Sequence, residues 1–114
     1  MNCEIIATPN FKKEVKPLVK KYSSLKGELE ELLQQLVQNP ITGTQIGSGA
    51  YKIRLAVKSK GKGKSGGMRV ITYVELSIAI ESPTQVFLLS IYDKSEVASI
   101  SKEEVKRLIK GKNG

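Results

Sequence analysis

The sequence contains no histidine and only one cysteine, and its apolar stretches are short. Without histidine, any acid–base chemistry must use other side chains. A single thiol, Cys3, cannot form an intrachain disulfide, and we expect it to be buried in a strand. The N-terminus lacks the basic and apolar regions of a signal peptide, and no stretch approaches the roughly 18 apolar residues that cross a bilayer. These absences predict a cytoplasmic protein that does not enter a membrane.

Acidic residues are missing from a long part of the chain, since none occurs from Leu32 to Val74. Basic residues gather there instead: Lys52, Arg54, Lys58, Lys60, Lys62, Lys64 and Arg69. The formal net charge of +8 indicates an anionic partner, with nucleic acid as the first candidate and an acidic membrane surface or protein as the second. Glu28, Glu30 and Glu31 fit a solvated helix face, and Glu103 and Glu104 fit a helix start. The sequence shows no cluster of carboxylates or cysteines that would hold a metal, so we expect neither a metal nor a cofactor.

The length of 114 residues, 39% of them hydrophobic, predicts one domain that covers the whole chain. Its first half is helical. After a β-prone run at Cys3–Ala7, Thr8-Pro9-Asn10 is typical of a helix start, and Pro17 is expected to kink this helix or restart it. A second amphipathic helix begins after Ser23 or Ser24 and ends at Asn39-Pro40, which makes a helical hairpin.

The second half changes to the alternating pattern of strands. Ile41–Ala50 is rich in glycine and predicts a loop, and Lys58–Gly67 contains only Lys, Gly and Ser and predicts a mobile connection. Three strands are predicted: Lys52–Val57, Met68–Ile80 and Val86–Tyr92. Ser101 with Glu104 fits the capping box of a last short helix. The prediction is an α+β fold with an N-terminal strand and a helical hairpin packed on an antiparallel β-meander, and with a short C-terminal helix, all helices lying on one face.

The basic residues are expected to share one side of this sheet. Lys52 and Arg54 are two apart on a strand and therefore point to the same face, and Arg69 begins the returning strand beside them. This pattern is typical of a protein that binds a phosphate backbone. The alternative is a solvated face with a basic loop that keeps the protein soluble.

Four segments resemble, in their order and spacing, the RelE superfamily of toxins: Tyr51–Leu55, Lys58–Gly67, Arg69–Tyr73 and Leu89–Glu96. The lysine–glycine run is similar to the HigB-like branch. The resemblance implies a RelE-like fold and the toxin of a type II toxin–antitoxin system, a ribosome-dependent endoribonuclease that cleaves mRNA in the A site and inhibits translation. The implied partners are mRNA, the ribosome and an antitoxin, which we expect to be a helix-turn-helix protein. The implied reaction needs no metal: the 2′-hydroxyl attacks the adjacent phosphate and leaves a 2′,3′-cyclic phosphate and a 5′-hydroxyl.

The resemblance also implies the site residues. The catalytic positions of the family carry over to Lys52, Arg54, Arg69, Lys94 and Tyr92, and RNA or ribosome binding is expected of Lys58, Lys60, Lys62 and Lys64. Lys52 or Lys94 would transfer protons, because crowded cations lower the pKa of a lysine. Arg54 and Arg69 would stabilise charge on the phosphate. Tyr92 would stack on a base or pack at the rim.

Two alternatives remain open from the sequence. A ParE-like inhibitor of DNA gyrase shares the fold but binds a protein–DNA complex, and the fold alone does not separate the two activities. A non-catalytic RNA-binding module would also explain the charge. The nuclease is favoured by the long lysine run and by the presence of all four basic site residues, Lys52, Arg54, Arg69 and Lys94.

Overall fold

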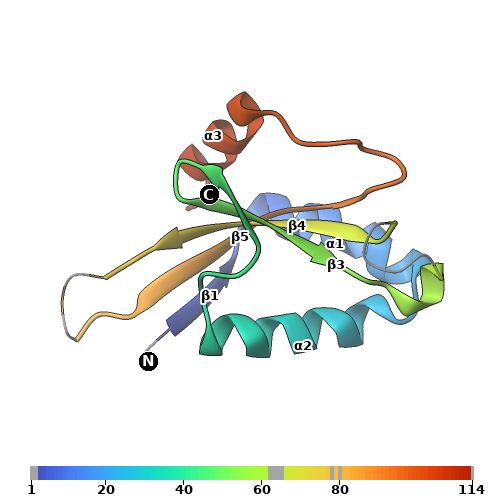
Figure 1. Cartoon of the computed structure of the whole chain (residues 1–114), viewed down its shortest axis with the longest axis horizontal. Coiled ribbons are helices and arrows are strands. Elements are labelled where there is room, and N and C mark those ends of the chain that lie inside the picture. The colour runs from blue at the N-terminus through green and yellow to red at the C-terminus, as the bar shows by residue number, and fades with distance from the viewer. Residues whose placement is uncertain (1–2, 62–65, 78, 80, 114) are drawn as a thin grey trace.

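Five strands form one mixed sheet with the order β1-β5-β4-β3-β2 (Figure 1). The computed structural model describes residues 3–61, 66–77, 79 and 81–113. Strands β3 (Ala50–Leu55), β4 (Met68–Glu75) and β5 (Thr84–Asp93) form the predicted antiparallel meander. Strand β1 (Cys3–Ala7) pairs in parallel with β5. The predicted α+β architecture is therefore confirmed, with a mixed sheet. Strand β4 ends at Glu75, earlier than the predicted Ile80, which lies outside the described residues.

The segment predicted as a glycine-rich loop contains a short edge strand, β2 (Thr44–Gly47), which pairs with the start of β3. The turn between the two strands has positive φ values, 96° at Gly47, 57° at Ser48 and 80° at Gly49. A tight hairpin turn requires this left-handed conformation, which glycine adopts without strain. The loop prediction was wrong because Ile46 is the one apolar residue of β2, so the strand carries no clear alternation.

Helix α1 (Pro9–Lys21) begins as predicted, because Thr8 Oγ1 accepts a hydrogen bond from the Phe11 N–H at 3.2 Å. The helix continues through Pro17, so the predicted restart is wrong. A proline ring removes one helical hydrogen bond, here the bond to the carbonyl of Lys13. Lys13 and Pro17 are both exposed, so water can bind that carbonyl and the helix tolerates the ring.

We expect Pro17→Ala to raise the free energy of unfolding by about 1–3 kcal/mol. The change restores a helical hydrogen bond and places the strongest helix former at an exposed position. Urea denaturation followed by circular dichroism measures the effect. Lys16→Ala is the matched control in the same turn and should change stability by less than about 0.5 kcal/mol. A Pro17→Ala protein less stable than the parent would contradict the prediction.

Helix α2 (Leu25–Gln38) starts after Ser24 and ends before Asn39, as predicted. Together with α1 it covers one face of the sheet. The main core lies between these helices and that face, and its buried side chains include Phe11, Leu25, Leu32, Leu36, Ile53, Val70, Val86, Leu88 and Ile91.

Helix α3 (Lys102–Lys110) packs on the other face of the sheet, opposite α2 (Figure 1). The prediction that all helices lie on one face is therefore wrong. Strands β4 and β5 are apolar on both faces, and Ile71, Phe87 and Leu89 form a second cluster with Leu108 of α3. Strands that are apolar on both sides need a covering layer on each.

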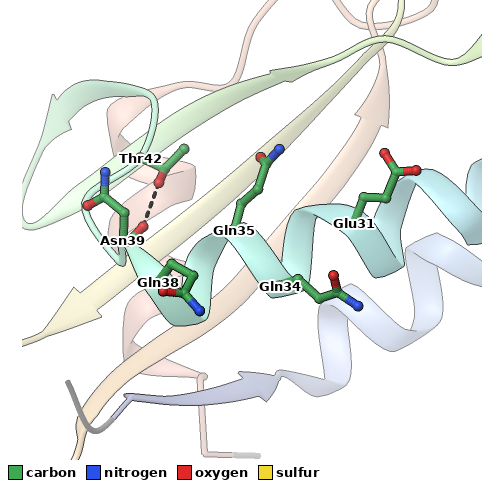
Figure 2. A pocket seen from close by; sticks show the side chains of 6 residues that line it. All are labelled: Glu31, Gln34, Gln35, Gln38, Asn39 and Thr42. Atoms are coloured by element: carbon green, nitrogen blue, oxygen red, sulfur yellow. Dashed lines mark hydrogen bonds between the residues drawn. The ribbon is translucent and has the colours of Figure 1, made fainter.

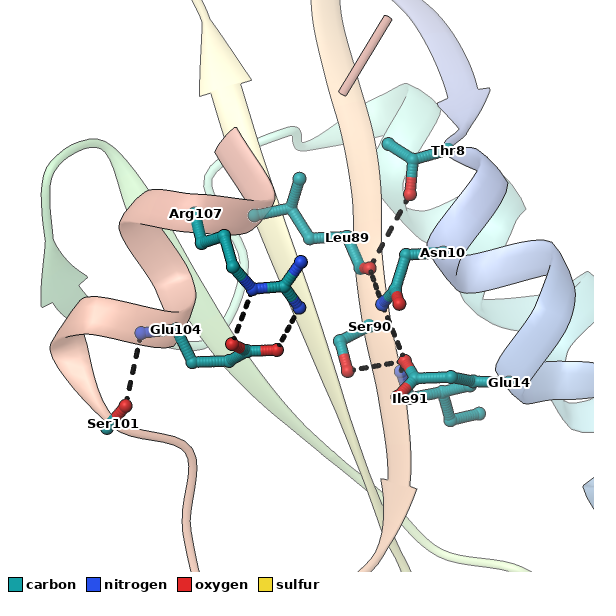
Figure 3. Close-up of polar contacts among 9 residues, drawn as sticks. All are labelled: Thr8, Asn10, Glu14, Leu89, Ser90, Ile91, Ser101, Glu104 and Arg107. Carbon is teal, nitrogen blue, oxygen red and sulfur yellow. Dashed lines mark hydrogen bonds and ion pairs between the residues drawn. The ribbon is translucent and has the colours of Figure 1, made fainter. Parts of the chain in front are cut away.

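The predicted capping box of α3 is half formed. Ser101 Oγ accepts a hydrogen bond from the backbone N–H of Glu104 at 3.1 Å. The Glu104 carboxylate does not complete the box, because it accepts two hydrogen bonds from Arg107 instead (Figure 3).

Side chains of α1 bind the edge of β5 beyond the last residue of β1 (Figure 3). Asn10 Nδ2 donates to the Leu89 carbonyl at 2.9 Å. Glu14 Oε1 accepts from the Ser90 hydroxyl at 2.7 Å and from the Ile91 N–H at 3.3 Å. These bonds replace the strand partner that β5 loses where β1 ends, and they fix α1 along β5.

Candidate functional site

Three of the predicted site residues meet in one row across the sheet. Arg54 on β3 lies directly opposite Arg69 on β4, and Arg69 lies directly opposite Tyr92 on β5. We call these three residues the arginine row. Lys52 lies two residues from Arg54, opposite Ile71. Like charges directly opposite each other destabilise a sheet, so the pairing of Arg54 with Arg69 is a feature that an anionic ligand would stabilise.

The arginine row is exposed at one end and buried at the other. Arg54 is exposed, whereas Arg69 is 4% and Tyr92 is 8% exposed. Arg69 Nη1 donates to the Met68 carbonyl at 3.2 Å. Burial raises the pKa of Tyr92, although the positive charge of Arg69 and the N–H of Ile100 act against it. The Tyr92 hydroxyl therefore stays protonated at neutral pH, and a ring buried in this way does not stack on a base.

Lys52 and Arg54 open into different hollows, although they share a strand. Lys52 is half-buried and lines a cavity of about 260 Å³ between β2, β3 and α3, together with Lys102 and Val105. Arg54 lines a groove of about 250 Å³ between β3 and α2, together with Lys58 and with the carboxylates Glu28 and Glu31. The strand thus presents one cation to each hollow, and Lys102 is a neighbouring cation that sequence reasoning missed.

Lys94 lies just beyond the end of β5 and is half-buried. Its Nζ donates to the Ala98 carbonyl at 2.9 Å, and its backbone N–H donates to the Gly67 carbonyl at 3.1 Å. The second bond ties the start of β4 to the segment that follows β5. Lys94 is therefore held beside the strand ends that carry Arg69 and Tyr92.

Lys60 belongs to a short 3-10 turn, η1 (Lys58–Lys60), and it makes a buried ion pair. Its Nζ donates to Asp93 Oδ1 at 2.6 Å, and the two side chains are 5% and 1% exposed. Asp93 also accepts hydrogen bonds from the Tyr22 hydroxyl and from the Ser95 N–H, both at 2.9 Å. Burial alone would raise the pKa of Asp93, but the hydrogen bonds from Lys60, Ser95 and Tyr22 outweigh it and hold the pKa well below its ordinary value.

This ion pair corrects the prediction made for Lys60. A buried ammonium held by a carboxylate is not available to a phosphate, so an RNA-binding role does not fit Lys60. The predicted mobile connection is also wrong for its first residues, since the Lys58 N–H donates to Glu28 Oε2 at 2.8 Å. Lys58 has an exposed side chain and remains a candidate. Lys62 and Lys64 lie outside the described residues, so their RNA-binding roles stay predictions.

Sequence reasoning missed Asp93 and Tyr22 as the partners of Lys60. Asp93 and Lys60 are 33 positions apart, and Asp93 and Tyr22 are 71 apart. One signal was present, because Asp93 ends a strand that is otherwise buried, and a buried carboxylate is almost always paired.

A polar hollow at the C-terminal end of α2 is a separate feature (Figure 2). It is lined by Glu31, Gln34, Gln35, Gln38, Asn39 and Thr42. None of the predicted site residues lines it, its side chains carry no positive charge, and its one carboxylate, Glu31, would repel a phosphate. The arginine row is therefore the better candidate for chemistry on a phosphate.

The described part of the chain contains no group of three His, Cys, Asp or Glu side chains that could hold a metal ion. Within the same residues, no helix is long and apolar enough to cross a membrane. The groups that the candidate site offers are the amino groups of Lys52 and Lys94, two guanidinium groups and a protonated phenol. These can move protons and stabilise negative charge.

Residues 5–112 match the family model described as the RelE toxin of the RelE / RelB toxin-antitoxin system. The match covers nearly the whole chain and includes every residue of the arginine row together with Lys52 and Lys94. The resemblance found in the sequence is thereby confirmed at the level of the family. This chain belongs to the RelE toxin family, the toxins that act in RelE/RelB toxin–antitoxin systems.

Proposed function

We propose that this toxin is a metal-independent endoribonuclease that cleaves mRNA in the ribosomal A site and thereby stops translation. The observation that carries the proposal is the cross-strand pair Arg54–Arg69 beside Tyr92. Two guanidinium groups on one face of a sheet suit a phosphate whose charge increases in the transition state. The family match supports the role as a toxin, and the arginine row supports cleavage at a phosphate.

In the proposed reaction the 2′-oxygen of one nucleotide forms a bond to the adjacent phosphorus, and the bond from phosphorus to the 5′-oxygen breaks. A lysine in its neutral amine form accepts the proton of the 2′-hydroxyl, and the departing 5′-oxygen takes up a proton from water. We assign proton acceptance to Lys52, which opens into a cavity, in preference to Lys94, whose ammonium is held by the Ala98 carbonyl.

The two arginines have different tasks in this proposal. Arg54 is exposed and meets the phosphate first, while Arg69 is buried and comes into contact only when the residues over it move on the ribosome. Tyr92 stays protonated and packs beside Arg69. The antitoxin named by the family is RelB; that it carries a helix-turn-helix remains a prediction.

The purified protein is expected to cut mRNA within the A-site codon of programmed ribosomes and to leave a 5′-hydroxyl and a 2′,3′-cyclic phosphate. The activity should survive EDTA at a concentration that leaves the ribosomes intact, because the proposed groups are all side chains of Lys, Arg and Tyr. Primer extension and end analysis of the fragments measure both results. An mRNA with 2′-deoxyribose at the attacking nucleotide is the matched control and should stay intact.

Two outcomes would contradict the proposal. One is a loss of cleavage in EDTA that a specific divalent ion restores while the ribosomes are intact. The other is a result that favours the gyrase alternative. Under the proposed function, pulse labelling in growing cells should show protein synthesis failing before DNA synthesis. An early block of DNA synthesis with translation intact would favour a gyrase inhibitor.

A further inference from the structure

A stripe of lysines on α1 forms a second basic surface outside the candidate site. Lys12, Lys13, Lys16 and Lys20 are all exposed, and we call them the lysine stripe. At 100° per residue, their positions fall within a sector of roughly 100° on the helix. The one carboxylate of the helix, Glu14, lies outside this sector and binds β5. One face of α1 is therefore purely cationic.

The lysine stripe destabilises the helix that carries it. Lys12 and Lys16 are four residues apart, as are Lys16 and Lys20, and like charges at this spacing repel each other on a helix. The ion pairs formed between described residues are Lys21–Glu96, Lys60–Asp93 and Arg107–Glu104, and none includes a stripe lysine. Within the described residues no carboxylate therefore pairs with the stripe, and an anionic ligand would relieve the repulsion between its lysines.

The stripe runs toward the candidate site. Its first and last members are eight positions apart, or about 12 Å along the helix. The stripe ends at Lys20, two residues before Tyr22, whose hydroxyl donates to Asp93 at 2.9 Å. Asp93 in turn lies between Tyr92 and Lys94 in the sequence. A ligand that follows the stripe is thus led to the end of the sheet where the buried part of the arginine row lies.

We propose that the lysine stripe binds the phosphate backbone of ribosomal RNA and holds the toxin on the ribosome while the arginine row acts on mRNA. This inference rests on the proposed function, because that function supplies the ribosome as the RNA. A lysine ammonium is a hydrated point charge that suits phosphate binding without sequence preference. Protein interfaces instead are depleted of lysine and depend on aromatic or arginine anchors, and the exposed sector of the stripe has none.

The test compares two pairs of substitutions that are matched in charge, spacing and exposure. Lys16→Gln with Lys20→Gln removes two stripe charges, and Lys106→Gln with Lys110→Gln removes two exposed charges from α3. Each pair is separated by four residues, and glutamine preserves helix propensity. Circular dichroism should show the same fold for both variants and the parent, and the stripe variant should unfold no earlier than the parent because it loses two like-charge repulsions.

Binding to vacant 30S subunits is measured by filter binding from 50 to 200 mM salt. The stripe variant should bind about tenfold more weakly at 100 mM salt, and the slope of log affinity against log salt should become shallower by about 1.5, since each phosphate contact contributes roughly 0.7–0.9. Its single-turnover cleavage rate at saturation should stay within about twofold of the parent. The α3 variant should retain most of the salt slope of the parent.

Three results would distinguish a failure of the stripe as a binding site from a failure of the proposed nuclease function. Equal losses in both variants would mean a net-charge effect and would overturn the stripe as a site. Normal 30S binding with a lost affinity for RelB would assign the stripe to a protein partner and would also overturn it. If the parent binds 30S subunits but never cleaves mRNA, and the stripe variant still loses its salt slope, the stripe stands and the nuclease proposal fails.

Discussion

Arg69→Gln is expected to lower the single-turnover cleavage rate on programmed ribosomes by roughly 100- to 1,000-fold, which is the usual cost of removing one charge-stabilising donor from a transition state. Affinity for the ribosome should stay within a few-fold, because other cations carry the binding. This separation of rate from affinity is the signature of a group whose interaction strengthens in the transition state. Single-turnover cleavage and filter binding of the same preparations measure the two quantities.

Arg69 is buried, so its replacement also tests folding. Arg69→Lys keeps the charge but loses the planar fork of donors, and we expect a rate between those of the parent and Arg69→Gln. Arg54→Gln is the companion variant, because the opposite arginine is exposed and its loss leaves the fold intact. We expect it to cleave at least tenfold more slowly. If folded Arg69→Gln and Arg54→Gln both cleave at the parent rate, the assigned site is wrong and the chain is a non-catalytic RNA-binding protein.

The arginine row shows which parts of a site a sequence can predict. The period of two along a strand placed Lys52 and Arg54 on one side, and the lysine–glycine run before Arg69 predicted a hairpin that returns beside them. Those inferences use only neighbours in the chain. The burial of Arg69 and Tyr92 depends on which segments cross the second face of the sheet, and no local pattern contains that information.

The same distinction holds for the fold. The cap of α1, the apolar periods of α1 and α2 and the three strands of the meander are local features, and the sequence predicted them. The serine cap expected for α2 did not form, because Ser24 makes no capping hydrogen bond. The parallel pairing of Ile5 with Val86 joins residues that are far apart in the sequence. The position of α3 depends on apolar side chains that β4 and β5 present to the second face. Both results come from tertiary packing, which overrides the pattern of any single element.

The buried ion pair gives the largest expected effect on stability. Asp93→Ala should lower the free energy of unfolding by about 3–5 kcal/mol, because it leaves the Lys60 ammonium buried without its carboxylate. A domain of this size has roughly 5–15 kcal/mol of stability, so the loss is a large part of the total. Urea denaturation at pH 7 measures the change. Glu104→Ala is the matched control: it removes the carboxylate of the exposed Arg107 pair and should cost less than about 1 kcal/mol.

A double variant separates the ion pair from simple loss of packing. Lys60→Met with Asp93→Leu replaces both charges by apolar side chains, and an exchange of this kind is often neutral or stabilising. The double variant should therefore be more stable than Asp93→Ala by about 2 kcal/mol or more. If its loss of stability instead equals the sum of the losses in Lys60→Met and Asp93→Leu measured separately, the network of Tyr22 and Ser95 around the carboxylate carries the stability, and the ion pair does not.

Asp93 also determines how the fold responds to acid. An unfolded aspartate has a pKa of about 3.9, and the hydrogen bonds to Asp93 hold its folded-state pKa well below that value. A carboxyl with a lowered pKa contributes stability that is fully present above the unfolded pKa and is lost as the pH falls through the folded pKa. The parent should therefore lose stability steadily as the pH falls below about 4, and Asp93→Asn should be less stable at pH 7 but show a flatter dependence over that acid range. Parallel acid profiles for the two proteins would mean that Asp93 keeps an ordinary pKa, and the Lys60 ammonium would then contribute little to holding the turn against β5.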